Sequence, residues 1–299
     1  MDRLQIMRLF VRAIELGSFS AVARTEGTSQ PTVSKSIAGL ERELGVRLIE
    51  RSTTSLAATD EGRRFYQRCR QLLEDYDDAV LDVRGQVQQV VGVLTVSAPL
   101  GLGQLRLNAL VLKFLAAHPG LEIALLLNDR MVDLVEEGVD VAIRLAGDLP
   151  PNAVARPVAS SQRVVVASPG YLRRAAPITT PPDLEKHEVV RFAGLASRGI
   201  LDFASGSQQI KVETSGRYQI NNSLALRECL VEGIALGSAP AWLVQDLIDA
   251  GDLVRVLPEW TLPSQLLHLV YPSRRYLPLR TRTFLQFMAS KIVALPGFA

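Results

Sequence analysis

Cysteines, histidines and the sequence motifs of common enzyme classes are few or absent in this sequence of 299 residues. Its two cysteines, Cys69 and Cys229, stand far apart without metal-ligand or CxxC spacing, which suits a reducing compartment. Its three histidines are equally scattered. No GxSxG, HExxH or GxxxxGK[ST] motif occurs, and the GLGQLR segment at Gly101 lacks the third glycine of a dinucleotide fingerprint. We therefore expect no catalytic centre, no metal site and no cofactor.

Long apolar runs and an excess of one charge are also absent. No run approaches the roughly 20 apolar residues that span a bilayer. Charged residues such as Asp2, Arg8 and Arg12 interrupt the segment in which a signal peptide would have its apolar core. The 33 basic and 31 acidic residues give a formal net charge of +2, so no global positive field indicates nucleic acid or membrane binding. We expect a cytoplasmic protein whose contacts depend on local placement of charge.

Apolar residues, at 47% of the chain, are numerous enough for more than one hydrophobic core. The first helix is expected to end at Gly17 and is predicted by apolar residues at three- and four-residue steps. These residues are Leu4, Met7, Phe10, Val11 and Ile14. Ser18 or Ser20 is expected to cap a short second helix, and Gly27 to permit the tight turn that follows it.

A third helix is expected to begin at Thr28 or Ser29, with Pro31 in its first turn. Four apolar residues should point inward: Val33, Ile37, Leu40 and Leu44. The opposite face then carries Gln30, Pro31, Ser34, Lys35 and Ala38. Such a face fits a DNA major groove, where Gln pairs with adenine and Lys reaches guanine or phosphate.

A plain bundle of three helices would explain the periodicity equally well. The spacing of small Ala23, Gly27 and apolar Val33 nevertheless favours the corner of a helix-turn-helix. Residues 46–50 and 55–59 are predicted to be two short strands around a polar tip. These strands would make the motif winged and would place Arg47 and Arg51 near the DNA backbone.

The segment ELGSFSAVARTEGTSQPTVSKSIAGLERELGVRLIERS, followed by ATDEG at 58–62, resembles the winged helix-turn-helix of LysR-type transcriptional regulators. The resemblance implies that residues 29–44 form the recognition helix. It also implies a set of DNA-contacting residues: Ser29, Gln30, Pro31, Thr32, Ser34, Lys35, Arg51 and Thr53. The family often has Arg where Lys35 stands and a basic residue where Thr54 and Ser55 stand. Arg51 is therefore expected to carry more of the binding by the wing.

A long helix is predicted from Thr59, a good N-cap, to about Gln89, which is about 45 Å at 1.5 Å per residue. Its apolar residues have heptad spacing: Phe65, Cys69, Leu72, Tyr76, Ala79 and Val83. Packing of this helix on the C-terminal domain of the same chain also fits the pattern, but a second copy explains more, because a symmetric pair reads two half-sites. The resemblance implies a homodimer or homotetramer.

Beyond Gly92, short β-rich runs alternate with helical patterns, which is typical of parallel α/β layers. The expected strands are 93–96, 121–127, 139–143, 164–167, 189–192, 218–220, 234–236 and 266–270. The expected helices are 104–117, 131–136, 223–232, 240–249 and 279–292.

Five phrases in this part resemble the effector domain of the same family: GVLTVSAPLG, LVEEGVDVAIRL, VVVASPGYL, GDLVRVLPEW and VYPSRRYLPLRTRTFLQF. The resemblance implies a periplasmic-binding-protein-like α/β fold of two subdomains, one from 92–162 plus 265–299 and the other from 163–264. The expected domains are a winged helix-turn-helix at 1–58, a linker and dimerisation helix at 59–90, and an effector-binding domain at 91–299.

Ligands of such sheets favour the crevice at the carboxyl ends of strands. The residues expected there are Ser97, Pro99, Leu100, Gly101, Arg144, Asn221, Asn222, Gly237 and Ser238. A small carboxylate is the expected ligand class, since a hydroxyl, free N–H groups and a guanidinium suit an anion. The same residue types are also common in structural roles: serines as helix caps, asparagines as turn residues, and an arginine such as Arg144 as a member of an ion pair.

The residue patterns together with the family resemblance imply sequence-specific regulation of transcription, modulated by a small effector. Its partners would be double-stranded DNA, the effector, other copies of the chain and RNA polymerase, with no membrane. An enzyme is disfavoured because no catalytic constellation occurs. A solute-binding protein is disfavoured because it would have no use for a recognition helix.

Overall fold

The computed structural model describes residues 2–51, 56–83, 89–130, 133–134, 136–145, 153–193, 199–273 and 277–299. The chain forms two compact units. The N-terminal unit is Met1–Val90 with the segments Val132–Val139 and Arg275–Leu279. The C-terminal unit is Val91–Met131, Asp140–Arg274 and Arg280–Ala299.

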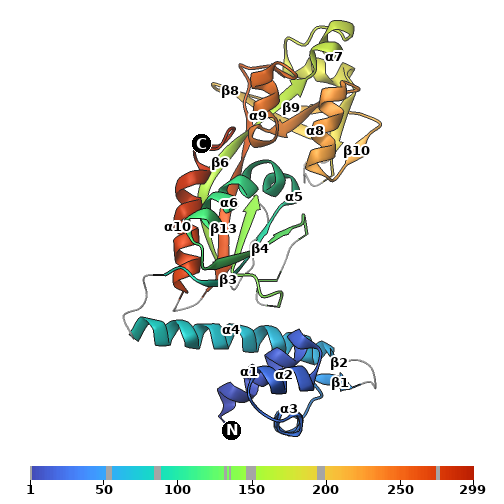
Figure 1. Ribbon diagram of the computed structural model, residues 1–299. Coiled ribbons are helices and arrows are strands. Elements are labelled where there is room, and N and C mark those ends of the chain that lie inside the picture. The colour runs from blue at the N-terminus through green and yellow to red at the C-terminus, as the bar shows by residue number, and fades with distance from the viewer. Residues whose placement is uncertain are drawn as a thin grey trace. The chain divides into compact units, whose positions relative to one another are not determined.

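The N-terminal unit contains a helix-turn-helix and a wing (Figure 1). Its elements are α1 (Arg3–Leu16), α2 (Phe19–Thr25), α3 (Gln30–Leu44), β1 (Ile49–Arg51), β2 (Leu56–Ala58) and α4 (Asp60–Val83). Ser18 and Ser29 cap α2 and α3, because each hydroxyl accepts the N–H group three residues further on at 3.3 Å. Between the two helices, Gly27 has φ of 62°, a conformation that glycine adopts without strain. The predicted winged helix-turn-helix is confirmed.

The core of this unit joins all three short helices to α4. Phe10 of α1, Val22 of α2 and both Val33 and Ile37 of α3 are fully buried. The prediction for Leu44 was wrong: this residue is 42% exposed, since it is the last residue of α3 and the chain turns away at Gly45.

The predicted heptad seam on α4 is divided between two environments. Cys69 is fully buried and Phe65 is partly buried in the core of the N-terminal unit, where Phe65 packs on Phe10 with ring centroids 5.5 Å apart. Further along α4, Leu72, Tyr76 and Val83 are 53%, 47% and 88% exposed, and Ala79 is exposed as well. The part of the seam that is open to a second helix therefore begins at Leu72.

The C-terminal unit is built around one mixed sheet in the order β10-β7-β11-β6-β13-β5-β3-β4, with β12 paired to β6. Its strands are β3 (Gly92–Ala98), β4 (Leu121–Leu127), β5 (Val141–Leu145), β6 (Ala153–Ala167), β7 (Val189–Phe192), β10 (Gln219–Ile220), β11 (Leu236–Pro240), β12 (Val254–Val256) and β13 (Leu262–Pro272). Strand β3 is parallel to β4 and β5, and β7 is parallel to β10 and β11. A separate hairpin consists of β8 (Ile200–Ser205) and β9 (Gln208–Glu213).

The sheet has two lobes, and the two long antiparallel strands β6 and β13 connect them (Figure 1). The first part of β6 pairs with β13, and its last part pairs with β11 and β12. Lobe I contains β3, β4 and β5 with α5 (Leu100–Leu102), the π-helix η1 (Gly103–Leu107), α6 (Asn108–Ala117) and α10 (Leu279–Ile292). Lobe II contains β7 to β12 with α7 (Pro169–Arg174), the 3-10 helix η2 (Pro181–Lys186), α8 (Ser223–Glu232) and α9 (Ala241–Ala250).

The helical stretch Leu100–Ala117 is, by length and composition, apolar enough to cross a membrane, with a mean hydropathy of 1.3 over 18 residues. Its apolar side chains have another use in this structure. Leu102 and Leu107 are fully buried in the C-terminal unit, and Phe114 packs against Phe284 of α10 with ring centroids 5.2 Å apart. These contacts are those of a core helix.

Several predicted elements differ from the structure in extent. Only 164–167 were expected to be a strand, whereas β6 begins at Ala153. Pro157 disfavours a strand prediction for the first part, because proline is uncommon inside strands; in the structure β6 has a bulge beside it, where Leu267 pairs with Ala159 and His268 with Pro157. The hairpin β8–β9 was not predicted. The predicted helix at 131–136 lies partly outside the described residues.

Candidate nucleic-acid interface and ligand cleft

The solvent-facing side of α3 is polar and carries little bulk. Gln30, Pro31 and Lys35 are exposed, while Thr32 and Ser34 are partly buried. None of these side chains is packed inside the N-terminal unit, because the apolar residues of α3 lie on its opposite face. An exposed helix face of this composition can enter a major groove.

The first turn of α3 is held by its own side chains. The Ser29 hydroxyl accepts the N–H of Thr32 and lies 2.7 Å from the Thr32 hydroxyl, which fixes the start of the helix. Pro31 has no N–H group and the N–H groups of the next two residues are donated to Ser29, so the helix dipole rather than a set of free amides favours phosphate at this end. Of the two predicted wing contacts, the Arg51 side chain and all of Thr53 lie outside the described residues.

A second polar constellation lies at the carboxyl edge of lobe I. Ser97 at the end of β3 is fully buried, and its hydroxyl accepts a hydrogen bond from Arg144 Nη2 at 2.8 Å. Arg144 is on β5, which pairs directly with β3. Asn128, which follows β4, donates its backbone N–H to the Ala98 carbonyl at 3.0 Å. Two of the predicted ligand residues, Ser97 and Arg144, are therefore brought together.

The other predicted ligand residues have varied surroundings. The Leu100 N–H is donated to Asp129 Oδ1 at 3.0 Å, so this amide is already occupied. Asn222 caps α8, since its Oδ1 accepts the N–H groups of Leu224 and Ala225. Ser238 is buried within β11, and Asn221 is exposed. Pro99 precedes α5, and Gly237 lies tightly against Val190.

Two buried polar side chains that were not predicted from the sequence have an atom without a hydrogen-bond partner. The Asn128 Oδ1 atom is buried at the carboxyl edge of lobe I without a hydrogen bond. On β6, where pairing passes from β13 to β11, Arg163 Nη1 is likewise buried without a partner. Burial lowers the pKa of the Arg163 guanidinium to about 10. The position of Asn128 directly after a parallel strand was a usable signal, whereas nothing in the sequence indicated the burial of Arg163.

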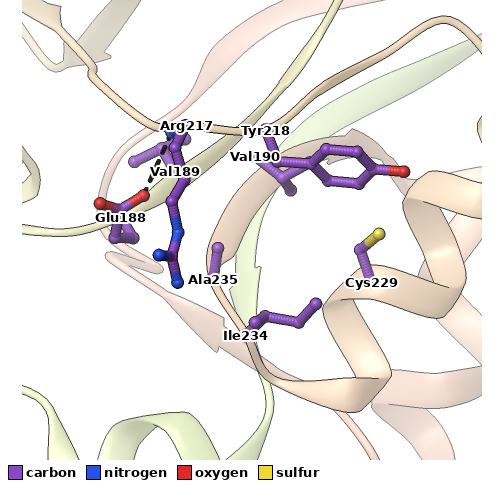
Figure 2. Close-up of a pocket in the computed structure, with 8 residues that line it drawn as sticks. All are labelled: Glu188, Val189, Val190, Arg217, Tyr218, Cys229, Ile234 and Ala235. Atoms are coloured by element: carbon purple, nitrogen blue, oxygen red, sulfur yellow. Dashed lines mark hydrogen bonds between the residues drawn. The ribbon is translucent and has the colours of Figure 1, made fainter.

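A separate hollow of about 360 Å³ lies in lobe II between β7 and α8 (Figure 2). Tyr218 and Ile234 face each other across it, and the Cys229 thiol and the Arg217 guanidinium line its sides. Burial, followed by the charge of Glu228, raises the pKa of Cys229. Within the described part of the chain, no three His, Cys, Asp or Glu side chains gather as a metal site.

Comparison with known families gives two matches that together cover most of the chain. Residues 4–63 match the bacterial regulatory helix-turn-helix protein family of lysR type. Residues 88–292 match the LysR substrate binding domain. The first match contains α1 to α3 and the wing, and the second contains both lobes.

Individual relatives agree with these matches over nearly their whole length. The chain is 31% identical over 293 residues to the probable HTH-type transcriptional regulator LtrA of Klebsiella pneumoniae, covering 97% of this chain and 94% of LtrA. It is 31% identical to the HTH-type transcriptional regulator PtxR of Pseudomonas aeruginosa, covering 93% and 89%. The solved structure of CrgA, a LysR-type transcriptional regulator of Neisseria meningitidis, is similar with a TM-score of 0.61 and 27% identity, covering 96% and 98%. The chain therefore belongs to the LysR family of transcriptional regulators, with a DNA-binding helix-turn-helix and an effector-binding domain, and is not an enzyme.

Proposed function

We propose that the protein is a cytoplasmic homodimer that binds operator DNA through α3 and responds to a small carboxylate bound between the lobes. The domain bounds that we propose are 1–58, 59–90 and 91–299. The observation that carries the proposal is the exposed polar face of α3, which bears Gln30 and Lys35. The proposed DNA contacts are Ser29, Gln30, Pro31, Thr32, Ser34, Lys35, Arg51 and Thr53.

The exposed stripe on α4 supports the dimer. Leu72, Tyr76 and Val83 are spaced four and seven residues apart on one helix and remain largely exposed in a single chain. A second copy of α4 would cover them, and the resulting two-fold pair would present two recognition helices to two half-sites. Pairing of dimers into a tetramer, and contact with RNA polymerase, are further parts of this proposal.

Two partly buried arginines support an anionic effector. Arg144 is anchored beside Ser97 at the carboxyl edge of lobe I, with its Nη2 donating to the Ser97 hydroxyl at 2.8 Å. The uncompensated Arg163 guanidinium adds a second positive charge on the strand that joins the lobes. A buried charge without a counter-ion is costly, and a bound carboxylate would offset that cost. Binding would shift the population between two lobe arrangements and thereby the spacing of the DNA-binding heads.

Titration with small carboxylic acids tests the effector proposal. The reporter is the fluorescence of Trp242, which is buried at the start of α9. At least one acid from a panel of aliphatic and aromatic mono- and dicarboxylates should change this fluorescence. The corresponding uncharged amide should not change it. Arg144→Ala should weaken binding of that acid by about tenfold to a hundredfold, the cost of a charge-assisted hydrogen bond. Unchanged affinity in this variant would remove Arg144 from the site, and no response to any acid would contradict a carboxylate effector.

A further inference from the structure

Three charged side chains from both lobes meet beside α9. Arg106 belongs to η1 of lobe I, whereas Arg227 of α8 and Asp246 of α9 belong to lobe II. Arg106 donates from Nη2 to Asp246 Oδ1 at 2.6 Å and from Nε to the Trp242 carbonyl at 2.9 Å. One side chain of lobe I thus holds two points on α9 of lobe II.

The same carboxylate has a second arginine on its own lobe. Arg227 donates to both oxygens of Asp246, at 2.9 Å and 2.5 Å, and to the Leu243 carbonyl at 2.5 Å. The side chains of Arg106 and Arg227 are only 11% and 18% exposed, and that of Asp246 is 40% exposed. Burial raises the pKa of Asp246, but hydrogen bonds from Arg227 and Arg106 outweigh it and hold the pKa at about 2. The carboxylate is therefore ionised throughout the physiological pH range.

The lobes also touch at a second place, where α5 meets the start of α8. A Cβ atom on Gly101 would lie 2.1 Å from the Ser223 hydroxyl and 3.3 Å from its Cβ. No side chain fits between the lobes here without rotation of Ser223 or a small separation. This contact and the charged cluster both depend on the lobes being close together.

We propose that Arg106, Asp246 and Arg227 form a reversible clamp that holds the two lobes together, with Arg106 as its moving part. Separation of the lobes has to break the bonds from Arg106 to Asp246 and to the Trp242 carbonyl. Asp246 keeps both of its hydrogen bonds from Arg227 when this happens, so opening does not leave the carboxylate without a partner. A single pair between the lobes would lack this property, because opening it would leave the carboxylate of lobe II without a partner.

The clamp stabilises one arrangement of the lobes and so affects how a ligand changes that arrangement. An effector that favours a different lobe arrangement has to overcome the Arg106 contacts, and one that favours this arrangement gains from them. This consequence rests on the proposed function. The clamp itself does not, because its contacts involve no ligand.

An engineered disulfide reports directly on lobe closure in the full-length protein. Gly101→Cys together with Ser223→Cys would introduce two facing cysteines. Their Cβ atoms would lie 3.3 Å apart, close to the 3.5–4.5 Å that is typical of disulfides. Cys229→Ala removes the one native cysteine that is not fully buried, and Cys69 is buried with its pKa raised to about 12 by that burial. Formation of the bond under mild oxidation is followed by mass spectrometry.

The clamp predicts that the disulfide forms in this parent and that Arg106→Met slows its formation by at least about tenfold, since both hydrogen bonds from Arg106 to α9 are lost. Arg227→Met, the matched control, should not slow formation of the disulfide, because the contact of Arg106 with Asp246 remains and opening would then leave the carboxylate without a partner. Arg106→Lys keeps the charge and should give an intermediate rate, which also serves if the methionine variant folds poorly. Failure of the disulfide to form in the parent, or equal rates for Arg106→Met and the parent, would overturn the clamp. Failure to find an effector would leave these rates unaffected.

Discussion

Replacing both Gln30 and Lys35 with alanine should lower the affinity of the protein for its operator by at least about a hundredfold. Each direct contact to a base edge or phosphate contributes about 1–3 kcal/mol, and the loss occurs in both subunits of a dimer. The free energy of unfolding should barely change, because both side chains are exposed. Fluorescence anisotropy with labelled operator DNA measures the affinity, and thermal denaturation measures the stability.

A charge-matched control separates specific contact from general attraction. Arg68→Ala removes one exposed positive charge from α4, away from the predicted groove-binding face, and should change the affinity only slightly. The salt dependence adds detail, since loss of a phosphate contact reduces its slope by about one per subunit, whereas loss of a base contact leaves the slope intact. Wild-type affinity in the double variant would show that α3 does not read the DNA.

Gly62→Ala should destabilise the N-terminal unit by about 3 kcal/mol, at the upper end of the usual range for overpacking. Gly62 lies in the first turn of α4 against the backbone of Leu48, and a Cβ atom there would be 1.9 Å from the Leu48 carbonyl oxygen. A backbone carbonyl cannot rotate away as a side chain does, so α4 would have to shift from the wing. Hydrogen exchange of the α3 amides in the full chain measures the local unfolding free energy.

Gly39→Ala is the matched control for this prediction. Gly39 lies inside α3, and apart from its chain neighbours and the backbone of its own helix no atom lies within 4 Å of the position that a Cβ atom would take. Alanine should therefore stabilise the unit by up to about 1 kcal/mol through helix propensity. Equal protection of the α3 amides in both variants would contradict the close packing of α4 on the wing.

Local patterns accounted for much of the fold. The bounds of α8, α10, β4 and β7 agree with the prediction because their patterns are strong and flanked by caps or turns. The Ser18 and Ser29 caps and the turn at Gly27 follow from the same local chemistry. The exposed face of α3 was predictable for this reason as well, since the face opposite a buried stripe follows from helical geometry alone.

Features that depend on distant contacts were not visible in the sequence. Phe65 and Cys69 belong to the same heptad pattern as Leu72, yet they pack in the core of the N-terminal unit, because periodicity does not say which partner covers a stripe. The contact of Arg106 with Asp246 joins residues 140 positions apart, and no local signal indicates it. Ser97 and Arg144 were predicted from strand ends, but the capping role of Asn222 became clear only in the structure.

Binding of the wild-type protein to the DNA upstream of its own gene tests the central claim most directly. A gel-shift series with excess unrelated competitor DNA should show a specific complex whose affinity falls by about 10³–10⁵ between 50 and 200 mM salt if six to ten phosphates are contacted. DNase protection should cover two half-sites about one helical turn apart, or a multiple of it. A folded protein that shows no preference for this DNA over unrelated DNA at any salt concentration would contradict the account.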